Sequence, residues 1–361
     1  MPSPYDLDRE GLAQLLTGEP PFRTQQVWDA IYRQHLRFDE MTSVPKALRA
    51  RLAAQLPGAL SEERESVAGS GQTIKWLLGL PDGARIETVL MHYPDRSTVC
   101  VSTQAGCAMA CGFCATGQGG FQRQLSAGEI IEQVMHACRR SRPRRVSHVV
   151  LMGMGEPLAN YDNVLAGLHR LHDDAGISAR HLTVSTVGLV PGIERLAGEA
   201  LPVNLAVSLH AANDDLRNEL VPINRRYPLA TLSAACHRYL QTKNRRLTLE
   251  WALIEGVNDQ AADAAELAAF ARPLRAHVNL IPLNATAGYA LPGSRPERIA
   301  TFRECLTDLG VNATTRHSRG ADIDGACGQL RASQLGSGSS LPATSTGGDV
   351  TSGTDDPPDG P

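Results

Sequence analysis

Three features that often reveal the location or partners of a protein are missing from this chain of 361 residues. No run of apolar residues approaches the roughly 18 to 20 that a membrane-spanning helix needs. The first ten residues, MPSPYDLDRE, lack the basic start and apolar stretch of a signal peptide. The chain also has no excess of positive charge, because its formal net charge is −3 at pH 7. We therefore expect a cytoplasmic protein without membrane contacts, in which any contact with nucleic acid comes from local basic clusters.

Basic side chains gather at a few places. The clusters are Arg139, Arg140, Arg142, Arg144 and Arg145; Arg225 and Arg226; Arg245 and Arg246; and Lys46, Arg49 and Arg51. A solvated helix end or loop is the ordinary explanation of such a cluster. None of the arginine clusters predicts RNA binding by itself, whereas the helical segment of residues 1–60, with Lys46, Arg49 and Arg51 close together, is the RNA-contacting surface that we expect.

Composition divides the chain into four segments. Residues 1–60 contain two stretches with helical spacing, FRTQQVWDAIYRQHL and VPKALRARLAAQL, which predict a small helical accessory domain. Residues 61–96 contain TIKWLLGL and ARIETVLMHY around the turn Pro81-Asp82-Gly83, which predicts a β-rich connecting segment. Residues 331–361 are mostly Gly, Ser, Thr, Pro and Asp, so they have little to bury and predict a disordered tail.

Residues 97–330 repeat one pattern, a short run rich in β-branched residues followed by a helical stretch. The six runs are STVCVST, SHVVLMG, HLTVSTVG, VNLAVSLH, RLTLEWALI and HVNLIPLN. Such alternation predicts a parallel sheet, and polar or glycine-rich residues at the strand ends match the active-site rim of a βα barrel. Ser126 and Glu129 form a capping box for the first helix. We expect an α/β fold with an open six-stranded partial barrel, although a doubly wound sheet would give the same pattern.

Three of the eight cysteines, Cys107, Cys111 and Cys114, fall within eight residues of a loop that follows a strand. Clustered thiols in a reducing compartment bind metal or do chemistry more often than they form disulfides. Structural zinc takes four ligands, whereas three cysteines on a four-iron cluster leave one iron open. The count favours an iron–sulfur cluster, and a zinc site would need Cys100 or a distant residue.

The spacing C-x3-C-x2-C, with Phe113 before the last cysteine, resembles the signature of the radical S-adenosylmethionine (SAM) superfamily. Four longer segments resemble the RlmN/Cfr family of RNA adenine methyltransferases over residues 20–330: VSTQAGCAMACGFCATG, VVLMGMGEPLANYDNV, LAVSLHAANDDLRNELVPIN and GADIDGACGQL. The resemblance implies a partial (βα)6 radical-SAM barrel. It also implies one [4Fe-4S] cluster on Cys107, Cys111 and Cys114, and two molecules of SAM per turnover.

The resemblance further implies which residues contact the cofactor. Gly155 and Glu156 match the motif that binds the methionine amino group. The other implied contacts are Ser185, Ser208, Leu209, His210 and Asn284, each at a predicted strand end. Without the resemblance, Glu156 would be interpreted as a glutamate in the first turn of a helix and His210 as a structural hydrogen-bonding residue.

Three residues receive catalytic roles from the same resemblance. Cys327 is implied to carry the methyl group, Cys100 to release the product by forming a disulfide with Cys327, and Glu87 to accept a proton. Taken alone, Cys100 would be a buried strand residue and Glu87 a solvent-facing one. The remaining cysteines, Cys138, Cys236 and Cys305, fall on helical stretches and are assigned to the core.

The implied function is radical methylation of carbon 2 of an adenine in 23S rRNA and in tRNA. Carbon 2 is electron-poor and cannot attack the methyl sulfonium of SAM as a nucleophile, which is why a radical route is needed. We also expect an external electron donor and a monomer. Two alternatives stay open: methylation of carbon 8, and a zinc-stabilised RNA-binding module without catalysis.

Overall fold

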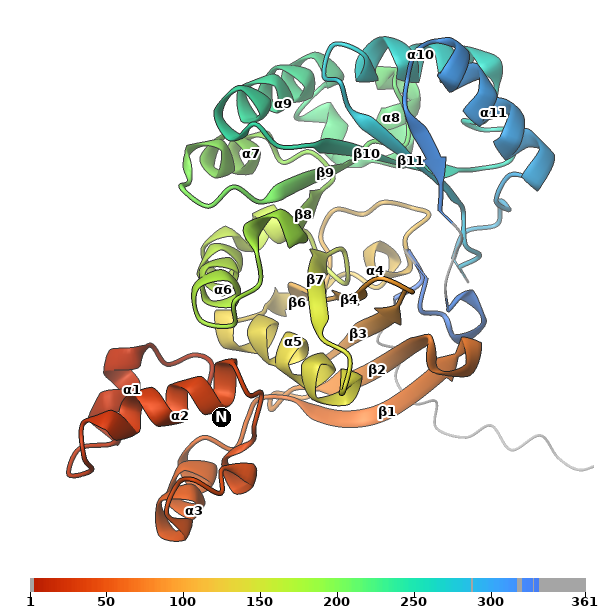
Figure 1. Ribbon diagram of the computed structural model, residues 1–361. Coiled ribbons are helices and arrows are strands. Elements are labelled where there is room, and N and C mark those ends of the chain that lie inside the picture. The colour runs from red at the N-terminus through yellow and green to blue at the C-terminus, as the bar shows by residue number, and fades with distance from the viewer. Residues whose placement is uncertain (1–2, 287, 317–319, 327, 331–361) are drawn as a thin grey trace, which may run out of the picture.

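The computed structural model describes residues 3–286, 288–316, 320–326 and 328–330 (Figure 1). The proposed tail and Cys327 therefore lie outside the described residues. One curved sheet forms the centre of the molecule, and helices cover its outer face. Within the described ranges, no helix is long and apolar enough to cross a membrane.

The large sheet has ten strands in the order β1-β2-β3-β4-β7-β8-β9-β10-β11-β12. Their bounds are β1 (Ser61–Ala68), β2 (Thr73–Gly79), β3 (Arg85–His92), β4 (Ser97–Cys100), β7 (Val146–Leu151), β8 (Leu182–Thr186), β9 (Asn204–Ser208), β10 (Leu247–Leu253), β11 (His277–Pro282) and β12 (Ala313–Thr315). Strands β1 to β4 pair antiparallel, and the pairs from β4 to β12 are parallel. The sheet thus has a parallel half and an antiparallel flank, β1 to β3.

The six strands predicted for the repeat are confirmed as β4, β7, β8, β9, β10 and β11. Each pairs with the next of these strands along the chain, and the order never reverses. A doubly wound sheet reverses its strand order at a switch point. The parallel half is therefore an open barrel, which β12 extends by a seventh strand at its edge.

Helices connect the parallel strands. Their bounds are α4 (Ala115–Gln118), α5 (Ala127–Ser141), α6 (Tyr161–Asp173), α7 (Val190–Gly198), α8 (Asp214–Leu220), α9 (Leu229–Lys243), α10 (Ala261–Ala271) and α11 (Pro296–Asp308). Helix α5 begins at the predicted capping box. The Ser126 hydroxyl accepts from the backbone N–H of Glu129 at 3.1 Å, and the Glu129 carboxylate accepts from the Ser126 N–H at 2.9 Å.

The antiparallel flank is β-rich, as predicted for residues 61–96, and it continues the barrel sheet through the pairing of β3 with β4. Strands β2 and β3 were predicted from alternation, whereas β1 was not. Half of the residues in its sequence, SEERESVA, are charged, and most of them are exposed. A charged edge strand forms because β2 offers it a complete hydrogen-bonding partner, and its charges oppose pairing with other molecules.

Three helices precede the sheet: α1 (Arg9–Leu15), α2 (Phe22–Tyr32) and α3 (Lys46–Gln55). The two helices predicted here are confirmed as α2 and α3, and the seven-residue α1 was missed. Trp28 and Tyr32 of α2 are buried. Trp28 donates its indole N–H to Asp174 at 2.8 Å, and Arg170 of α6 donates to the Tyr32 hydroxyl at 3.0 Å. These bonds attach the helical unit to the barrel.

Candidate active site

A cavity opens at the carboxyl ends of the parallel strands, where the sequence predicted an active-site rim. It holds about 1050 Å³ of empty space, part of it open to solvent, which is at the upper end of the range for small-molecule sites. The predicted site residues that line it are Cys107, Cys111, Cys114, Gly155, Glu156, Ser185, Ser208, His210 and Asn284. Residues up to 177 positions apart along the chain therefore share one cavity wall.

The three clustered cysteines lie in the loop between β5 (Gln104–Gly106) and β6 (Phe121–Gln124). These two short strands, which the sequence did not predict, pair antiparallel and close the loop at its base. Gly106 has φ +76°, and a Cβ at this position would lie 2.0 Å from the carbonyl oxygen of Gly120. Only glycine permits this close approach of the two strands.

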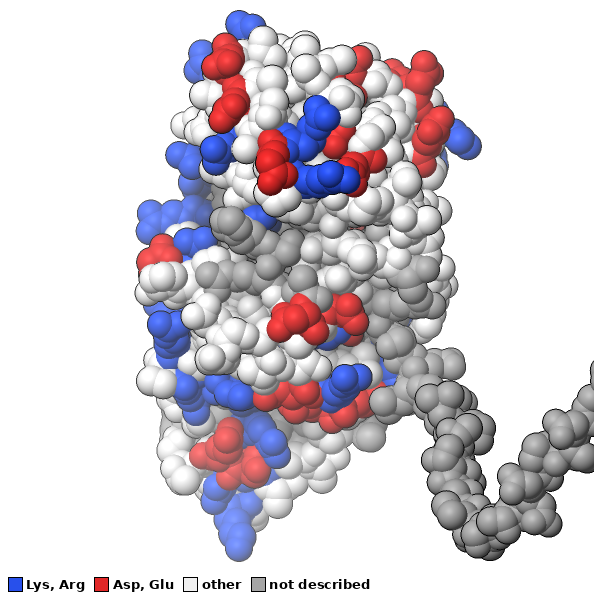
Figure 2. Space-filling view, turned by 90° about the vertical axis from the view of Figure 1, so that its right-hand side faces the viewer, with Lys and Arg blue, Asp and Glu red and all other residues white. Residues whose placement is uncertain are grey.

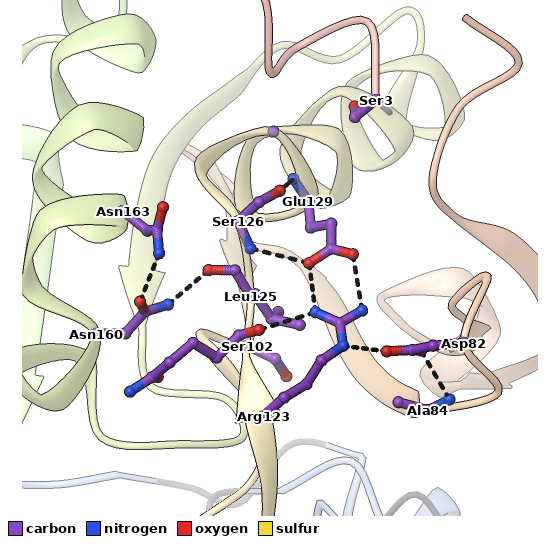
Figure 3. A network of polar contacts seen from close by, with 12 residues as sticks. Ser3, Asp82, Ala84, Ser102, Arg123, Leu125, Ser126, Glu129, Asn160 and Asn163 are labelled. Carbon is purple, nitrogen blue, oxygen red and sulfur yellow. Dashed lines mark hydrogen bonds and ion pairs between the residues drawn. The ribbon is translucent and has the colours of Figure 1, made fainter. Parts of the chain in front are cut away.

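Arg123 anchors the strand that leaves the cysteine loop (Figure 3). Its guanidinium donates two hydrogen bonds of 2.8 Å to the Glu129 carboxylate on α5, and its Nε donates to Asp82 in the turn between β2 and β3. The bidentate geometry gives a directional contact. Arg123 thus ties the loop both to the first barrel helix and to the antiparallel flank.

Burial determines the protonation of the loop thiols. It raises the pKa of Cys107 to about 11 and raises the pKa of Cys111 further. Without metal these thiols are protonated at neutral pH, so metal binding must displace their protons. Among the described residues, no three His, Cys, Asp or Glu side chains converge to hold one metal ion. A closed zinc site gathers its ligands on one ion, whereas a four-iron cluster takes each thiolate on a different iron.

Gly155 and Glu156 follow β7 and form the next part of the wall. Gly155 has φ +101°, and a Cβ there would lie 2.5 Å from the Cβ of Gln104. The Glu156 carboxylate accepts backbone N–H bonds from Val187 at 2.9 Å and from Leu158 at 3.0 Å. Burial raises the pKa of Glu156 to about 7. Glu156 does cap the short helical turn that follows it, as the ordinary interpretation holds, and it also lines the cavity.

His210 likewise combines a structural bond with a place in the wall. Its Nδ1 accepts from the backbone N–H of Ala252 at 3.0 Å, and its ring meets Phe113 edge-on at 4.8 Å. Burial lowers the pKa of His210 to about 3, so the ring is neutral. Because Nδ1 accepts, the proton resides on Nε2. His210 can therefore donate one hydrogen bond to a ligand.

Leu209 differs from the other implied cofactor contacts, because it does not line the cavity. Its side chain is fully buried in the main hydrophobic core. Its backbone N–H donates to the Glu250 carbonyl at 3.0 Å, and its carbonyl accepts from Arg217 at 3.1 Å.

Glu87 and Cys100 lie on β3 and β4, and neither is among the residues that line the cavity. Val89 of β3 lies opposite Cys100 of β4 and opposite Lys75 of β2. Glu87 is two residues before Val89 on the same strand, so Lys75, Glu87 and Cys100 share one face of the sheet. Glu87 is only 4% exposed and pairs with the Lys75 ammonium at 3.0 Å. The interpretation of Glu87 as a solvent-facing residue is therefore wrong.

The described neighbours of Cys327 contact both of these regions. On one side, the Lys75 ammonium donates to the carbonyl of Asp324 at 3.2 Å. On the other, Gly328 and Leu330 line the cavity, and their carbonyls accept from the Ala115 N–H and the Thr116 hydroxyl. Cys327 itself is outside the described residues.

Sequence reasoning missed two buried charged residues, Glu250 and Arg217. Glu250 lines the cavity from β10. Arg217 of α8 is fully buried and donates to the carbonyls of Val187 at 2.7 Å and Leu209 at 3.1 Å. The signal was available for Glu250, because a charged residue inside the apolar run RLTLEWALI needs a partner or a ligand.

The basic clusters are partly used within the molecule. Arg140 pairs with Glu65 through two bonds of 3.1 Å, and Arg145 donates to the Gly176 carbonyl at 3.0 Å. Figure 2 shows Lys and Arg side chains gathered along one edge of the molecule, and charges of both signs on the face in view. Of the α3 cations, Arg49 donates to the Asp39 carbonyl at 2.9 Å and Arg51 pairs with Glu19 at 3.3 Å.

Two family models match the chain, the radical SAM superfamily over residues 101–268 and the ribosomal RNA large subunit methyltransferase N-terminal domain over residues 5–56. The chain is 51% identical over 344 residues to a probable dual-specificity RNA methyltransferase RlmN of Chloroflexus aurantiacus, which covers 90% of this chain and 92% of that protein. It is 48% identical over 336 residues to the dual-specificity RNA methyltransferase RlmN 1 of Myxococcus xanthus, and the match covers 91% of this chain and 94% of that protein. The crystal structure of a radical SAM methyltransferase from Sphaerobacter thermophilus matches with a TM-score of 0.88 and 51% identity. The match covers 92% of this chain and 99% of that one.

Proposed function

We propose that this chain, which belongs to the RlmN family of radical SAM RNA methyltransferases, methylates carbon 2 of adenine in 23S rRNA and in tRNA by way of Cys327. The observation that carries the proposal is the convergence on one cavity of three cysteines and the polar ends of β7, β8, β9 and β11. The names of the relatives, dual-specificity RNA methyltransferase, support two RNA substrates.

The cavity fits the two groups that radical SAM enzymes use. Three thiols would hold one [4Fe-4S] cluster and leave one iron open, and Gly155 and Glu156 would hold the methionine amino group of SAM. When bound, these groups supply the radical chemistry that an electron-poor aromatic carbon requires. The protein contributes orientation and the exclusion of water, and the buried aromatic ring of Phe113 beside His210 serves the second task.

Glu87 and Cys100 of the sheet face, together with Cys327, would carry the acid–base and thiol steps. Cys327, as a thiolate, would take a methyl group from SAM by displacement, with S-adenosylhomocysteine as the leaving group. After the base is joined to this sulfur through the methylene carbon, Glu87 accepts the ring proton. Cys100, as a thiolate, would then attack the Cys327 sulfur: a disulfide forms, the carbon–sulfur bond breaks, and its electron pair stays on the departing carbon, which takes up a proton and becomes the methyl group of the product. An external donor reduces the disulfide to two thiols. The shared face of Glu87 and Cys100 supports these roles.

The RNA substrate must present an unstacked adenine, since carbon 2 is otherwise enclosed by neighbouring bases. We propose that the helical accessory domain, residues 1–60, contacts the RNA through Lys46, Arg49 and Arg51. Replacing all three with alanine should weaken RNA binding and reduce its dependence on salt concentration. Replacing Arg225, Arg226 and Arg245, which lie outside this domain, is the matched control. Equal affinity of both variants at moderate salt would remove the proposed RNA surface.

The decisive experiment is anaerobic reconstitution with iron and sulfide, followed by an assay on unmodified 23S rRNA and tRNA. We expect a brown protein that absorbs near 400 nm, roughly as thiolate-to-iron charge transfer requires. Mass spectrometry of the nucleosides should find 2-methyladenosine. Finding 8-methyladenosine would establish the alternative position, and a colourless protein without activity would contradict the proposed function.

The catalytic cysteines have a separate test. Cys100→Ala should accumulate a covalent protein–RNA adduct, whereas Cys327→Ala should form neither adduct nor product. Equal activity of both variants and the unmodified protein would refute the thiol mechanism. We also propose that the enzyme works as a monomer in the cytoplasm, with residues 61–96 and 97–330 forming the connecting segment and the catalytic barrel.

A further inference from the structure

The wall of the cavity contains a charged side chain that the proposed mechanism does not use. Glu250 of β10 is 4% exposed and lines the cavity. Its Oε1 accepts from the Asn279 amide at 2.8 Å, whereas Oε2 is buried and has no hydrogen-bond partner among the described residues. Arg316 lies 3.8 Å from Oε2, close enough for an ion pair and too far for a hydrogen bond. Burying an acceptor without a hydrogen bond costs free energy of folding. This indicates that a ligand donates a hydrogen bond to Oε2 of Glu250.

A chain of side chains holds the Glu250 carboxylate in a defined orientation. Asn279 donates to Oε1, and the Thr314 hydroxyl donates to the amide oxygen of Asn279 at 3.1 Å. The Thr314 oxygen lies 2.9 Å from Nε2 of His277. Since Oε1 is committed to Asn279, Oε2 remains as the acceptor for a ligand.

The register of the sheet places Glu250 among the proposed cofactor contacts. Glu250 lies opposite Ser208 of β9 and opposite Asn279 of β11 in the two parallel pairings. Ser208 lines the same cavity. The cysteine loop and Glu156 belong to the β4–β7 side of the barrel, and Glu250 lies three strands further along the sheet order. A ligand held by its amino-acid end near Glu156 would extend its other end towards Glu250.

We propose that Glu250 binds SAM by accepting hydrogen bonds from its ribose hydroxyl groups. This inference rests on the proposed function, which supplies the cofactor. A carboxylate only accepts hydrogen bonds, and the vicinal diol of a ribose offers two O–H donors; glutamate and aspartate bind ribose hydroxyls in this way in dinucleotide-binding folds. The methionine carboxylate is excluded as the partner, since two carboxylates repel each other.

Binding of SAM in the absence of RNA and reductant tests the inference. Anaerobic titration calorimetry would use the cluster-loaded enzyme in a Cys327→Ala background, in which the cofactor is not consumed by methyl transfer. Glu250→Gln should weaken SAM binding about tenfold to a hundredfold, as expected for hydrogen bonds to a charged group. Glu255→Gln is the matched control, because Glu255 follows the same strand and pairs with Arg295 outside the cavity.

A second ligand identifies the contacted groups. An analogue of SAM without the 2′ and 3′ hydroxyls should bind the parent protein weakly, and Glu250→Gln should cause no further loss for this analogue. Equal loss for both ligands would place the contact elsewhere on the cofactor and overturn the inference. So would unchanged SAM affinity with weaker RNA binding, which would assign Glu250 to the RNA base.

Two observations separate the failure of this inference from the failure of the proposed function. If the parent protein takes up iron, absorbs near 400 nm and binds SAM, the proposed function is intact and only the role of Glu250 is in question. Should Glu250→Gln fail to fold, Glu250→Asp moves the carboxylate back by one methylene group while keeping its charge. It should then show weakened binding of SAM and not of the analogue, and equal affinity of Glu250→Asp and the parent for SAM would contradict the inference.

Discussion

The parallel half of the sheet and its antiparallel flank hold buried glutamates in opposite ways. In the parallel half, Glu156 accepts from the backbone N–H groups of Leu158 and Val187 and bonds to the Thr186 side chain, all of them neutral, and burial raises its pKa to about 7. In the flank, Glu87 is equally buried but pairs with the Lys75 ammonium at 3.0 Å. The parallel half therefore holds its carboxylate among neutral donors at the cavity, whereas the flank holds one against an ammonium group.

Removing a thiol of the cysteine loop should have the largest effect on cluster uptake and on methylation. Cys111→Ser should abolish cluster uptake and methylation together, because a serine hydroxyl is a poor ligand for iron. Iron content, absorbance near 400 nm and product formation are measured on the same reconstituted samples. Cys138→Ser is the control, since Cys138 is also buried but lies on α5 outside the cavity wall. A fully active Cys111→Ser enzyme would show that the parallel half does not hold the cluster.

A change in the flank should separate chemistry from cofactor binding. Glu87→Gln should slow methylation by about 10²- to 10⁴-fold, the usual contribution of a general base, and should leave SAM affinity unchanged. Single-turnover rates and anaerobic titration measure the two quantities. The control is Glu65→Gln, on the edge strand of the same flank, where the carboxylate contacts Arg140 at the surface. Weaker SAM binding by Glu87→Gln would erase the proposed difference between the two regions.

The strands that carry the cavity could be predicted because the chemistry of each is visible along the chain. The run HLTVSTVG contains enough β-branched residues to predict β8. The Ser126 capping box predicted the start of α5. The cysteine spacing and the four longer motifs carried the family resemblance, which implied which strand-end residues contact the cofactor. Parallel topology then places those ends at one rim, so the repeat predicted where the cavity lies and the resemblance implied most of the residues in its wall.

The features that were missed depend on partners distant in sequence. Strands β5 and β6 have three and four residues and exist because Gly106 lets the two backbones approach each other. Strand β1 is charged and is defined by its pairing with β2. The burial of Glu87 depends on Lys75, which lies on the neighbouring strand, two residues before Leu77, the residue opposite Glu87. Periodicity along a single segment carries none of this information.

Arg217 stabilises the parallel half, because its side chain connects the residues that follow β8 and β9. Its guanidinium donates to Val187 and Leu209 carbonyls and, at 2.7 Å, to the Asn224 side chain. Arg217→Met would leave these buried acceptors unpaired, and we expect a loss of about 3–5 kcal/mol in the free energy of unfolding. Urea unfolding measures the loss. Arg195→Met, which removes an exposed ion pair between Arg195 of α7 and Asp162 of α6, should have little effect.

The smallest expected effect is the pH dependence that follows from Glu156. Its folded-state pKa of about 7 exceeds the ordinary value of 4.5, so between these pH values the folded protein retains a proton that the unfolded chain has released. The stabilising contribution of the protonated form is therefore complete below pH 4.5 and is lost as the pH rises to about 7, a difference of about 3 kcal/mol.

Glu156→Gln removes this dependence, and urea unfolding of the cluster-free protein at several pH values measures it. Burial lowers the pKa of His35, His136 and His210, which makes stability rise with pH in the acidic range. These histidines are shared by both proteins, so they cancel when the two stability profiles are subtracted. The advantage of the unmodified protein over Glu156→Gln should shrink from pH 5 to pH 7.5. A constant difference would mean that Glu156 is ionised throughout, as an ion-paired carboxylate would be, and the contrast with Glu87 would fail.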